Sequence, residues 1–146
     1  MSDIITYREL VPDDYDSMIA AWNAAGLPAK PVGRDSRAEL SQHLLQEPEF
    51  FIGAFDNDKL IGLVIASSDR RKGWINRLAV IPDYRGRGIA RELIRRAEQA
   101  LYKTGIRIIS CLIFKTNLPS IKLFESEDYD STCPVLYLRK AFSDDV

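Results

Sequence analysis

The sequence lacks the features that mark secreted, membrane-spanning and metal-binding proteins. No apolar run among its 146 residues approaches the roughly 20 residues that a helix needs to cross a bilayer. Nothing at the N-terminus resembles the basic and apolar regions of a signal peptide. The two cysteines, Cys111 and Cys133, form no metal-ligand pattern, and His43 is the single histidine. We therefore expect a cytoplasmic protein with reduced thiols, with no bound metal and no membrane partner.

An excess of charge of either sign is also missing. The chain has 20 Lys and Arg residues against 21 Asp and Glu residues, for a net charge of −1. Basic residues lie near acidic ones except between Arg85 and Arg96. Bulk charge therefore gives no support to a nucleic-acid or membrane-surface role. The length favours a single domain over residues 1–146 that buries its core without disulfides.

The order of apolar patterns predicts a mixed α/β fold without repeats. We expect strands at residues 3–10, in a hairpin over 50–68 with its turn at 56–58, at 74–80, at 106–114 and at 135–142. We expect helices at residues 11–26, 36–46, 89–104 and 117–127. The run at 106–114 is almost unbroken in its apolar character, which is typical of a strand buried on both faces.

Local signals support three of the helices. Ser36 is followed three residues later by Glu39, which is the spacing of a capping box. Asn117 and Pro119 are suited to the start of a short helix. In the helix that ends before Gly105, one face gathers the apolar residues Ile89, Leu93, Ile94, Ala97 and Leu101.

One stretch, "LAVIPDYRGRGIARELIRRAEQAL" from Leu78 to Leu101, joins a strand to this helix through two glycines. Such a junction directs unpaired backbone N–H groups and the positive end of a helix dipole at one point, which suits a phosphate group. A dinucleotide fingerprint would need a third glycine where Arg91 stands, and a P-loop would need a Gly-Lys-Ser/Thr ending. Both of those nucleotide folds are disfavoured.

The arrangement Arg/Gln-x-x-Gly-x-Gly/Ala after a strand is matched by Arg85, Gly88 and Ala90. Here the sequence resembles the GCN5-related N-acetyltransferases (GNAT family) over nearly the whole chain, and the segments "AVIPDYRGRGIA" and "LFESEDY" are similar to a small bacterial YpeA-like branch. The resemblance implies a central, mostly antiparallel sheet with a splayed strand pair and flanking helices. It also implies transfer of the acetyl group of acetyl-CoA to a primary amine.

The resemblance implies cofactor contacts along the strand, the loop and the following helices. The residues are Leu78, Ala79, Val80, Arg85, Gly86, Arg87, Gly88, Ile89, Ala90, Asn117, Ser120 and Phe124. A bulge would splay the strand, so that pantetheine amides pair with its edge at Leu78 and Val80. The N–H of Leu78 or Ala79 would polarise the thioester carbonyl. Without the resemblance, Asn117 would be interpreted only as a helix cap. The Arg/Gly-rich segment would be interpreted only as a turn that ends the strand and begins the helix.

The sequence departs from the family at the residues that move protons. Many relatives carry a Glu base where Asn76 stands and a Tyr acid where Phe124 stands, and neither residue here can exchange a proton. The other candidates are Tyr129, Tyr137 and Cys111, each of which is also explained by packing alone. Asn76 can still position a water, and His43 has the sequence context of a structural or solvated histidine.

The sequence does not identify the acceptor of the acetyl group. The resemblance implies that the acceptor approaches over the loop after the first helix, where Trp22, Asn23 and Arg34 are the first groups to consider. The acceptor is a small-molecule or peptide amine, and we allow for a homodimer. Two alternatives remain: a catalytically reduced acetyl-CoA- or CoA-binding module, and an interaction domain in which "RGRGIARELIRR" is only a basic helix face.

Overall fold

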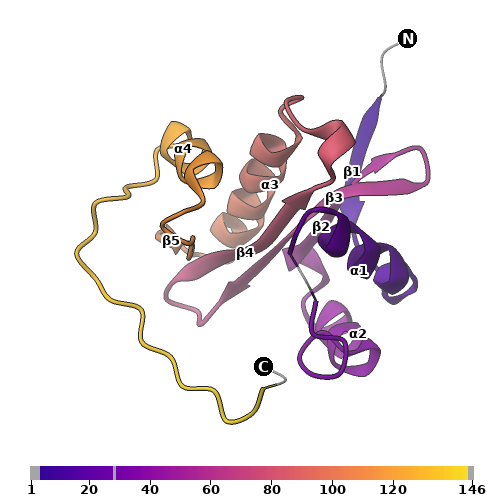
Figure 1. The fold of residues 1–146 in the computed structure, drawn as a ribbon, viewed down its shortest axis with the longest axis horizontal. Coiled ribbons are helices and arrows are strands. Elements are labelled where there is room, and N and C mark those ends of the chain that lie inside the picture. Colours follow the sequence, from indigo (N-terminus) through magenta and orange to yellow (C-terminus); the bar gives the residue numbers. More distant parts are fainter. Residues whose placement is uncertain (1–3, 28, 145–146) are drawn as a thin grey trace.

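The computed structural model describes residues 4–27 and 29–144, and it shows one five-stranded sheet with helices packed against it (Figure 1). Its elements in chain order are β1 (Ile5–Glu9), a 3₁₀ turn (Pro12–Asp14), α1 (Tyr15–Ala24), α2 (Arg37–Gln46), a second 3₁₀ turn (Pro48–Phe50), β2 (Phe51–Asp56), β3 (Lys59–Ser68), β4 (Gly73–Val80), a third 3₁₀ turn (Pro82–Tyr84), α3 (Ile89–Lys103), β5 (Ile109–Ser110) and α4 (Leu118–Ser126). The mixed α/β class is confirmed.

The strands lie in the sheet in the order in which they follow along the chain, from β1 to β5. Neighbours from β1 to β4 are antiparallel, and β5 pairs with β4 in parallel. The core sits around β3, where every residue from Leu60 to Ala66 is buried. Burial of consecutive residues means that both faces of this strand are covered. The helices that contact it are α1 and α3.

Most of the predicted local structure is confirmed. The buried face of α3 is made by Ile89, Leu93, Ile94, Ala97 and Leu101, as its pattern predicts. The Glu39 N–H donates to Ser36 Oγ at 3.3 Å, and the Ser120 N–H donates to Asn117 Oδ1 at 3.3 Å, so both predicted caps form. The hairpin turns at Asn57, whose φ is +54°. Asp3 and Pro28, at a predicted strand and loop, lie outside the described residues.

One predicted strand is much shorter than expected, and another is not formed in the described residues. The run at 106–114 forms only the two-residue β5, and Ile108, Leu112 and Phe114 are 54%, 55% and 85% exposed. Residues 135–142 have no regular structure and extend away from the sheet (Figure 1). An apolar run becomes a doubly buried strand only when elements cover both of its faces, and β5 has β4 on one side and no strand on the other among the described residues.

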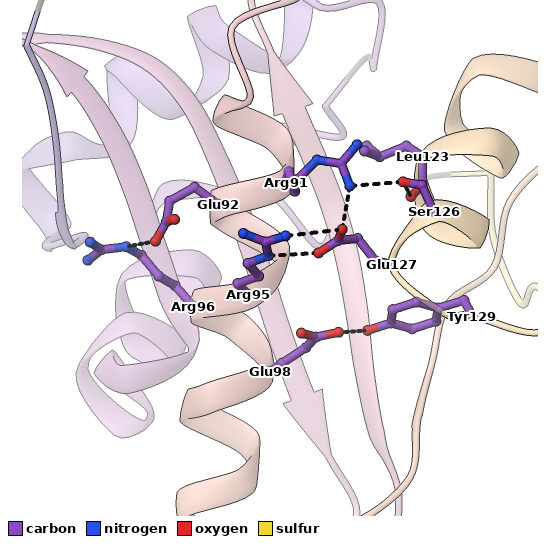
Figure 2. A network of polar contacts seen from close by, with 9 residues as sticks. All are labelled: Arg91, Glu92, Arg95, Arg96, Glu98, Leu123, Ser126, Glu127 and Tyr129. Atoms are coloured by element: carbon purple, nitrogen blue, oxygen red, sulfur yellow. Dashed lines mark hydrogen bonds and ion pairs between the residues drawn. The ribbon is translucent and has the colours of Figure 1, made fainter.

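Helix α4 is tied to α3 by a cluster of charged groups (Figure 2). Glu127, directly after α4, accepts a hydrogen bond from Arg95 Nε at 2.9 Å and another from Arg91. Arg91 also donates to Ser126 Oγ at 3.0 Å. The hydrogen bond from Arg95 and then that from Arg91 hold the pKa of Glu127 below its ordinary value, although burial opposes them. The ionised form of Glu127 therefore helps to hold the two helices together.

Replacing Glu127 tests this attachment. Because its pKa is lowered in the folded state, Glu127 stabilises the fold above the pKa of the unfolded chain, about 4.3, and the stabilisation is lost as the pH falls through the lower folded value. Glu127→Gln should lower Tm at pH 7, and the difference from the wild type should shrink as the pH falls below about 4.3. Glu92→Gln, which breaks only the exposed pair with Arg96, is the control and should change Tm less. A pH-independent difference would contradict the assignment.

Candidate active site

The loop between β4 and α3 has backbone donors that the described residues leave unused. Gly86 and Gly88 both have a φ of +78°, and Gly88 is the N-cap of α3. This left-handed conformation favours glycine, and an added Cβ at either position would meet nothing within 4 Å. Within residues 4–27 and 29–144, the N–H groups of Gly86, Gly88, Ile89 and Ala90 make no hydrogen bond. Open space beside unused donors at a helix N-terminus fits an anion such as a diphosphate.

The arginine side chains of this loop mainly hold its shape. Arg85 Nε donates to the Val80 carbonyl at 3.0 Å, and its Nη2 donates to the Ala25 carbonyl at 3.3 Å. Arg85 thus connects the end of β4 to the end of α1. Arg87 Nη2 donates to the Asp83 carbonyl at 3.3 Å, and its guanidinium lies over the Tyr84 ring. The guanidinium groups of Arg85 and Arg87 thus stabilise the conformation of the loop. They also place positive charge beside the unused N–H groups.

Strand β4 carries a bulge directly before this loop. Ala79 pairs with Leu63 and Asn76 with Ile65, so two β4 residues, Arg77 and Leu78, lie opposite a single β3 residue. Arg77 has a φ of +53°, which is uncommon for a residue with a side chain. A bulge adds one residue and redirects the strand beyond it. The bulge that the family resemblance implied is therefore present, at Arg77.

Beyond the bulge, the edge of β4 has no neighbouring strand among the residues that the structure describes. In the part of the chain that the structure describes, β5 pairs only with Gly73 and Trp74 at the start of β4. The Ile81 N–H donates to the Ile61 carbonyl on the β3 side. Because backbone groups alternate in direction along an antiparallel strand, the N–H groups of Leu78 and Val80 face away from β3. They point to the side where β4 and β5 have separated.

A buried cluster from the first helix and the following loop holds the bulge. Trp22 Nε1 donates to the Arg77 carbonyl at 3.2 Å, and the Arg77 guanidinium lies 4.5 Å from the centre of the Trp22 ring. Asp35 is 7% exposed, accepts the Lys30 N–H at 2.7 Å and lies 3.6 Å from Arg77 Nη2. Burial lowers the pKa of Arg77, and the charge of Asp35 opposes that shift.

The structure changes the roles expected in the loop after α1. Trp22 is fully buried, so the expectation that it faces the acceptor is wrong. Arg34 stays half exposed, with its Nε 3.9 Å from the Asp35 carboxylate, and Asn23 is exposed. The sequence analysis missed Asp35 and Arg77. Neither stands in a local pattern, and only their proximity in the fold shows that they act together.

The candidate proton carriers are held in separate environments. Asn76 Nδ2 donates to Ser67 Oγ at 3.0 Å. The Tyr129 hydroxyl donates to Glu98 at 2.7 Å, and burial together with this carboxylate raises its pKa. Burial raises the pKa of Cys111 to about 11. Phe124 is buried with its ring edge-on to Tyr129. None of these groups is set to give up a proton near neutral pH.

Two other candidates lie in exposed places. Tyr137 is 65% exposed, in the irregular segment after α4. His43 Nε2 lies 3.2 Å from Glu47 on the surface of α2, and its ring packs edge-on to Phe51. In the described ranges, no three or more His, Cys, Asp or Glu side chains gather in a way that could hold a metal ion. None of the described helices has both the length and the apolar character needed to cross a membrane.

Comparisons with known proteins point to a single family. The sequence model of a family described as the acetyltransferase (GNAT) family matches residues 9–128. An acetyltransferase of Sodalis glossinidius is 31% identical over 133 residues, which are 91% of this chain and 92% of that protein. The solved PaiA N-acetyltransferase of Thermoplasma acidophilum, in complex with coenzyme A, has a TM-score of 0.73 at 22% identity and covers 90% of this chain and 94% of its own.

A second solved structure has the same fold. The acetyltransferase AAC(6')-Iy, in complex with a bisubstrate analogue of CoA and acetylneamine, has a TM-score of 0.77 at 19% identity, over 94% of this chain and 99% of its own. At these identities the two structures establish the likeness of fold. The match of the family model over most of the chain, together with the Sodalis relative, establishes more: this chain belongs to the GNAT family of acetyltransferases.

Proposed function

We propose that the protein transfers the acetyl group of acetyl-CoA to the primary amine of a small-molecule or peptide acceptor. The observation that carries the proposal is the succession of an open β4 edge and a set of unused N–H groups at the start of α3. The first suits an extended pantetheine arm with its amides, and the second suits a diphosphate. Both groups belong to one CoA molecule, and here their two sites follow one another along the chain.

Different residues would bind different parts of the CoA molecule. The N–H groups of Gly86, Gly88, Ile89 and Ala90 would hold the diphosphate, with Arg85 and Arg87 adding charge. Leu78 and Val80 would pair with the pantetheine arm, while the backbone groups of Ala79 between them face β3. Asn117 and Ser120 at the start of α4, and Phe124 within it, would line its other side. CoA-bound structures with this fold, such as that of PaiA, support this placement.

The chemical step needs little from side chains. The acceptor nitrogen attacks the thioester carbon, the C–N bond forms, and the C–S bond breaks to release the CoA thiolate. The Leu78 N–H would donate to the carbonyl oxygen as negative charge develops on it. The amine proton passes to water, which Asn76 would position, and the thiolate takes a proton from solvent. CoA thiols have a pKa close to that of cysteine, about 8.5, so the thiolate can leave unaided.

Two finer assignments are also proposals. The small bacterial YpeA-like branch is supported by the segments "AVIPDYRGRGIA" and "LFESEDY", and the Sodalis relative, which this chain covers over 92% of its length, is likewise bacterial. A cytoplasmic location is supported by the two free cysteines, Cys111 and Cys133, since reduced thiols are typical of that compartment. The alternative of an interaction domain with a basic helix face loses support. Arg91 and Arg95 pair with Glu127, and Arg96 pairs with Glu92, so these charges are neutralised within the chain.

Ligand binding followed by a search for acceptors tests the function. Acetyl-CoA should raise Tm, by an amount equivalent to about 2.7 kcal/mol when its concentration is 100 times Kd. Thiol release should then be measured over small amines, amino acids, an aminoglycoside and peptides with a free N-terminus or lysine. At least one amine should give acetylated product. A thermal shift without product from any amine would favour the CoA-binding module. The absence of a thermal shift would contradict both the acetyltransferase and the CoA-binding module.

Gly88→Glu should abolish acetyl-CoA binding, because a carboxylate would stand beside the N–H groups that hold the diphosphate. Its φ of +78° adds backbone strain of about 1–2 kcal/mol. Gly105→Glu is the matched control: Gly105 has a φ of +97° and open space around it, but lies at the other end of α3. Calorimetric titration should show binding to the Gly105 variant alone. Equal binding to both variants would place the diphosphate elsewhere.

Trp22→Phe should lower kcat about 10- to 100-fold, because the bulge that aims the Leu78 N–H would lose the hydrogen bond on the Arg77 carbonyl. KM for acetyl-CoA should change less, since the diphosphate donors lie in the following loop. Trp74→Phe, at the start of β4, is the control and should keep wild-type kcat. Thermal melts of both variants would separate the effect from unfolding. An unchanged kcat in a folded Trp22→Phe protein would show that the bulge needs no such support.

Phe124→Tyr restores the hydroxyl that many relatives have at this position. If it reaches the leaving sulfur, kcat should rise by about tenfold, which is below the usual range for acid catalysis because the thiolate can leave unaided. Affinity for acetyl-CoA should barely change. Tyr129→Phe, the control, removes the hydroxyl already bound to Glu98 and should leave kcat unchanged. A lower rate for Tyr129→Phe would instead identify Tyr129 as the proton donor.

A further inference from the structure

A hollow of about 360 Å³ lies on the surface between the loop after α1 and helix α2. Arg34 lines it from the loop, and Glu39, Gln42 and Gln46 line it from the helix. Within residues 4–27 and 29–144, no ion pair joins Arg34 to Glu39, and the side chains of Glu39, Gln42 and Gln46 make no hydrogen bond. The hollow therefore presents one positive charge, one negative charge and two amide groups to a ligand.

The turn that carries Arg34 is held by its own hydrogen bonds. The N–H groups of Gly33 and Asp35 each donate to the Lys30 carbonyl at 3.0 Å, and the Lys30 N–H donates to the Asp35 carboxylate at 2.7 Å. The Arg34 side chain is 56% exposed and, in the part of the chain that the structure describes, makes no hydrogen bond. The backbone is thus fixed, while all the N–H donors of the guanidinium can bind a ligand.

Two charged side chains connect this hollow to the bulge of β4. The Asp35 carboxylate lies 3.9 Å from Arg34 Nε and 3.6 Å from Arg77 Nη2. Arg77 is followed by Leu78, whose N–H would polarise the thioester in the proposed reaction. The side chains of Asp35 and Arg77 thus separate the hollow from the reacting carbonyl. An acceptor held in the hollow by a charged end needs a flexible chain that carries its reactive amine past them.

Opposite charges in one hollow suit the two charged groups of an amino acid. A guanidinium binds a carboxylate through two parallel hydrogen bonds, so Arg34 suits the α-carboxylate. Glu39 suits the α-ammonium, and the Gln42 and Gln46 amides can take the remaining hydrogen bonds. An ammonium held by a carboxylate keeps its proton and has no lone pair for attack. The acetyl group would therefore have to go to a second amine.

We propose that the acceptor is a free amino acid with a primary amine at the end of its side chain, bound by its α-carboxylate at Arg34 and by its α-ammonium at Glu39. This inference rests on the proposed acetyl transfer and names its substrate class. The side-chain nitrogen attacks the thioester carbon and forms the C–N bond. The C–S bond breaks, the CoA thiolate leaves, and the amine proton passes to water.

Three amines with the same chain length test the two contacts separately. Lysine carries both α-groups, ε-aminocaproate lacks the α-ammonium, and cadaverine lacks the α-carboxylate. With acetyl-CoA, kcat/KM for lysine should exceed that for either analogue about 10- to 100-fold, the effect of losing a hydrogen-bonded charged group. Ornithine, δ-aminovalerate and putrescine repeat the comparison with a side chain one carbon shorter. Mass spectrometry of the product should locate the acetyl group on the side-chain nitrogen.

Variants of the hollow assign each contact to its residue. Arg34→Gln should lower kcat/KM for lysine about 10- to 100-fold, mainly through KM, and leave cadaverine unchanged, while Arg34→Lys should recover part of the loss. Glu39→Gln should lower kcat/KM for lysine and leave ε-aminocaproate unchanged. Arg37→Gln is the matched control, because the Arg37 side chain is 59% exposed but already pairs with Asp16 at 2.7 Å. It should keep wild-type values for all three amines.

Calorimetric titration separates a failure of this inference from a failure of the proposed function. In protein saturated with CoA, which has no acetyl group to transfer, lysine or ornithine should bind more tightly than its two analogues. Binding of CoA without this preference, product from other amines alone, or acetylation of the α-amine would overturn the substrate class and leave acetyl transfer standing. A protein that binds neither CoA nor acetyl-CoA would reject the proposed function, and the substrate class with it.

Discussion

The hydrogen bond from the Trp22 indole to the Arg77 carbonyl fixes the point on which the rest of the site depends. Arg77 holds a left-handed conformation that costs a residue with a side chain about 1–2 kcal/mol, and such a conformation persists only where its surroundings impose it. Here Trp22 and the buried Asp35 do so. The inserted residue redirects β4, so its last residues run on to the loop with no strand on their outer side among residues 4–27 and 29–144.

The positive charge of the loop is arranged around its backbone. Arg85 and Arg87 donate to the carbonyls of Val80, Ala25 and Asp83, and so they set the path of the chain between β4 and α3. The N–H groups left unused are those of the peptide backbone itself. A backbone donor loses no side-chain entropy when it binds, so the loop is organised for an anion before one arrives.

In the proposed reaction, proton transfer falls to the solvent. Asn76 and Phe124 cannot exchange a proton, and the Tyr129 hydroxyl is already bound to Glu98, with its pKa raised. Burial also raises the pKa of Cys111, so its thiol stays protonated near neutral pH. An acceptor amine would therefore have to reach the site in its neutral form. We would then expect transfer to become faster as the pH rises toward the pKa of that amine.

The sequence by itself determined the features that depend on neighbours along the chain. The caps at Ser36 and Asn117, the turn at Asn57 and the apolar face of α3 all follow from spacings of a few residues, and they appear as predicted. The glycine pair before α3 also indicated the candidate diphosphate site. These features need only local backbone geometry and one apolar face.

Tertiary structure alone decided the position of the bulge at Arg77, the burial of Asp35 and the extent of β5. Each depends on a partner that is distant in sequence: Arg77 on Trp22, and β5 on the short stretch of β4 beside it. The apolar runs at 106–114 and 135–142 have the composition of strands, but a strand forms only where another strand accepts its hydrogen bonds. The composition of a segment shows that it can form a strand. The rest of the fold determines whether a partner strand lies beside it.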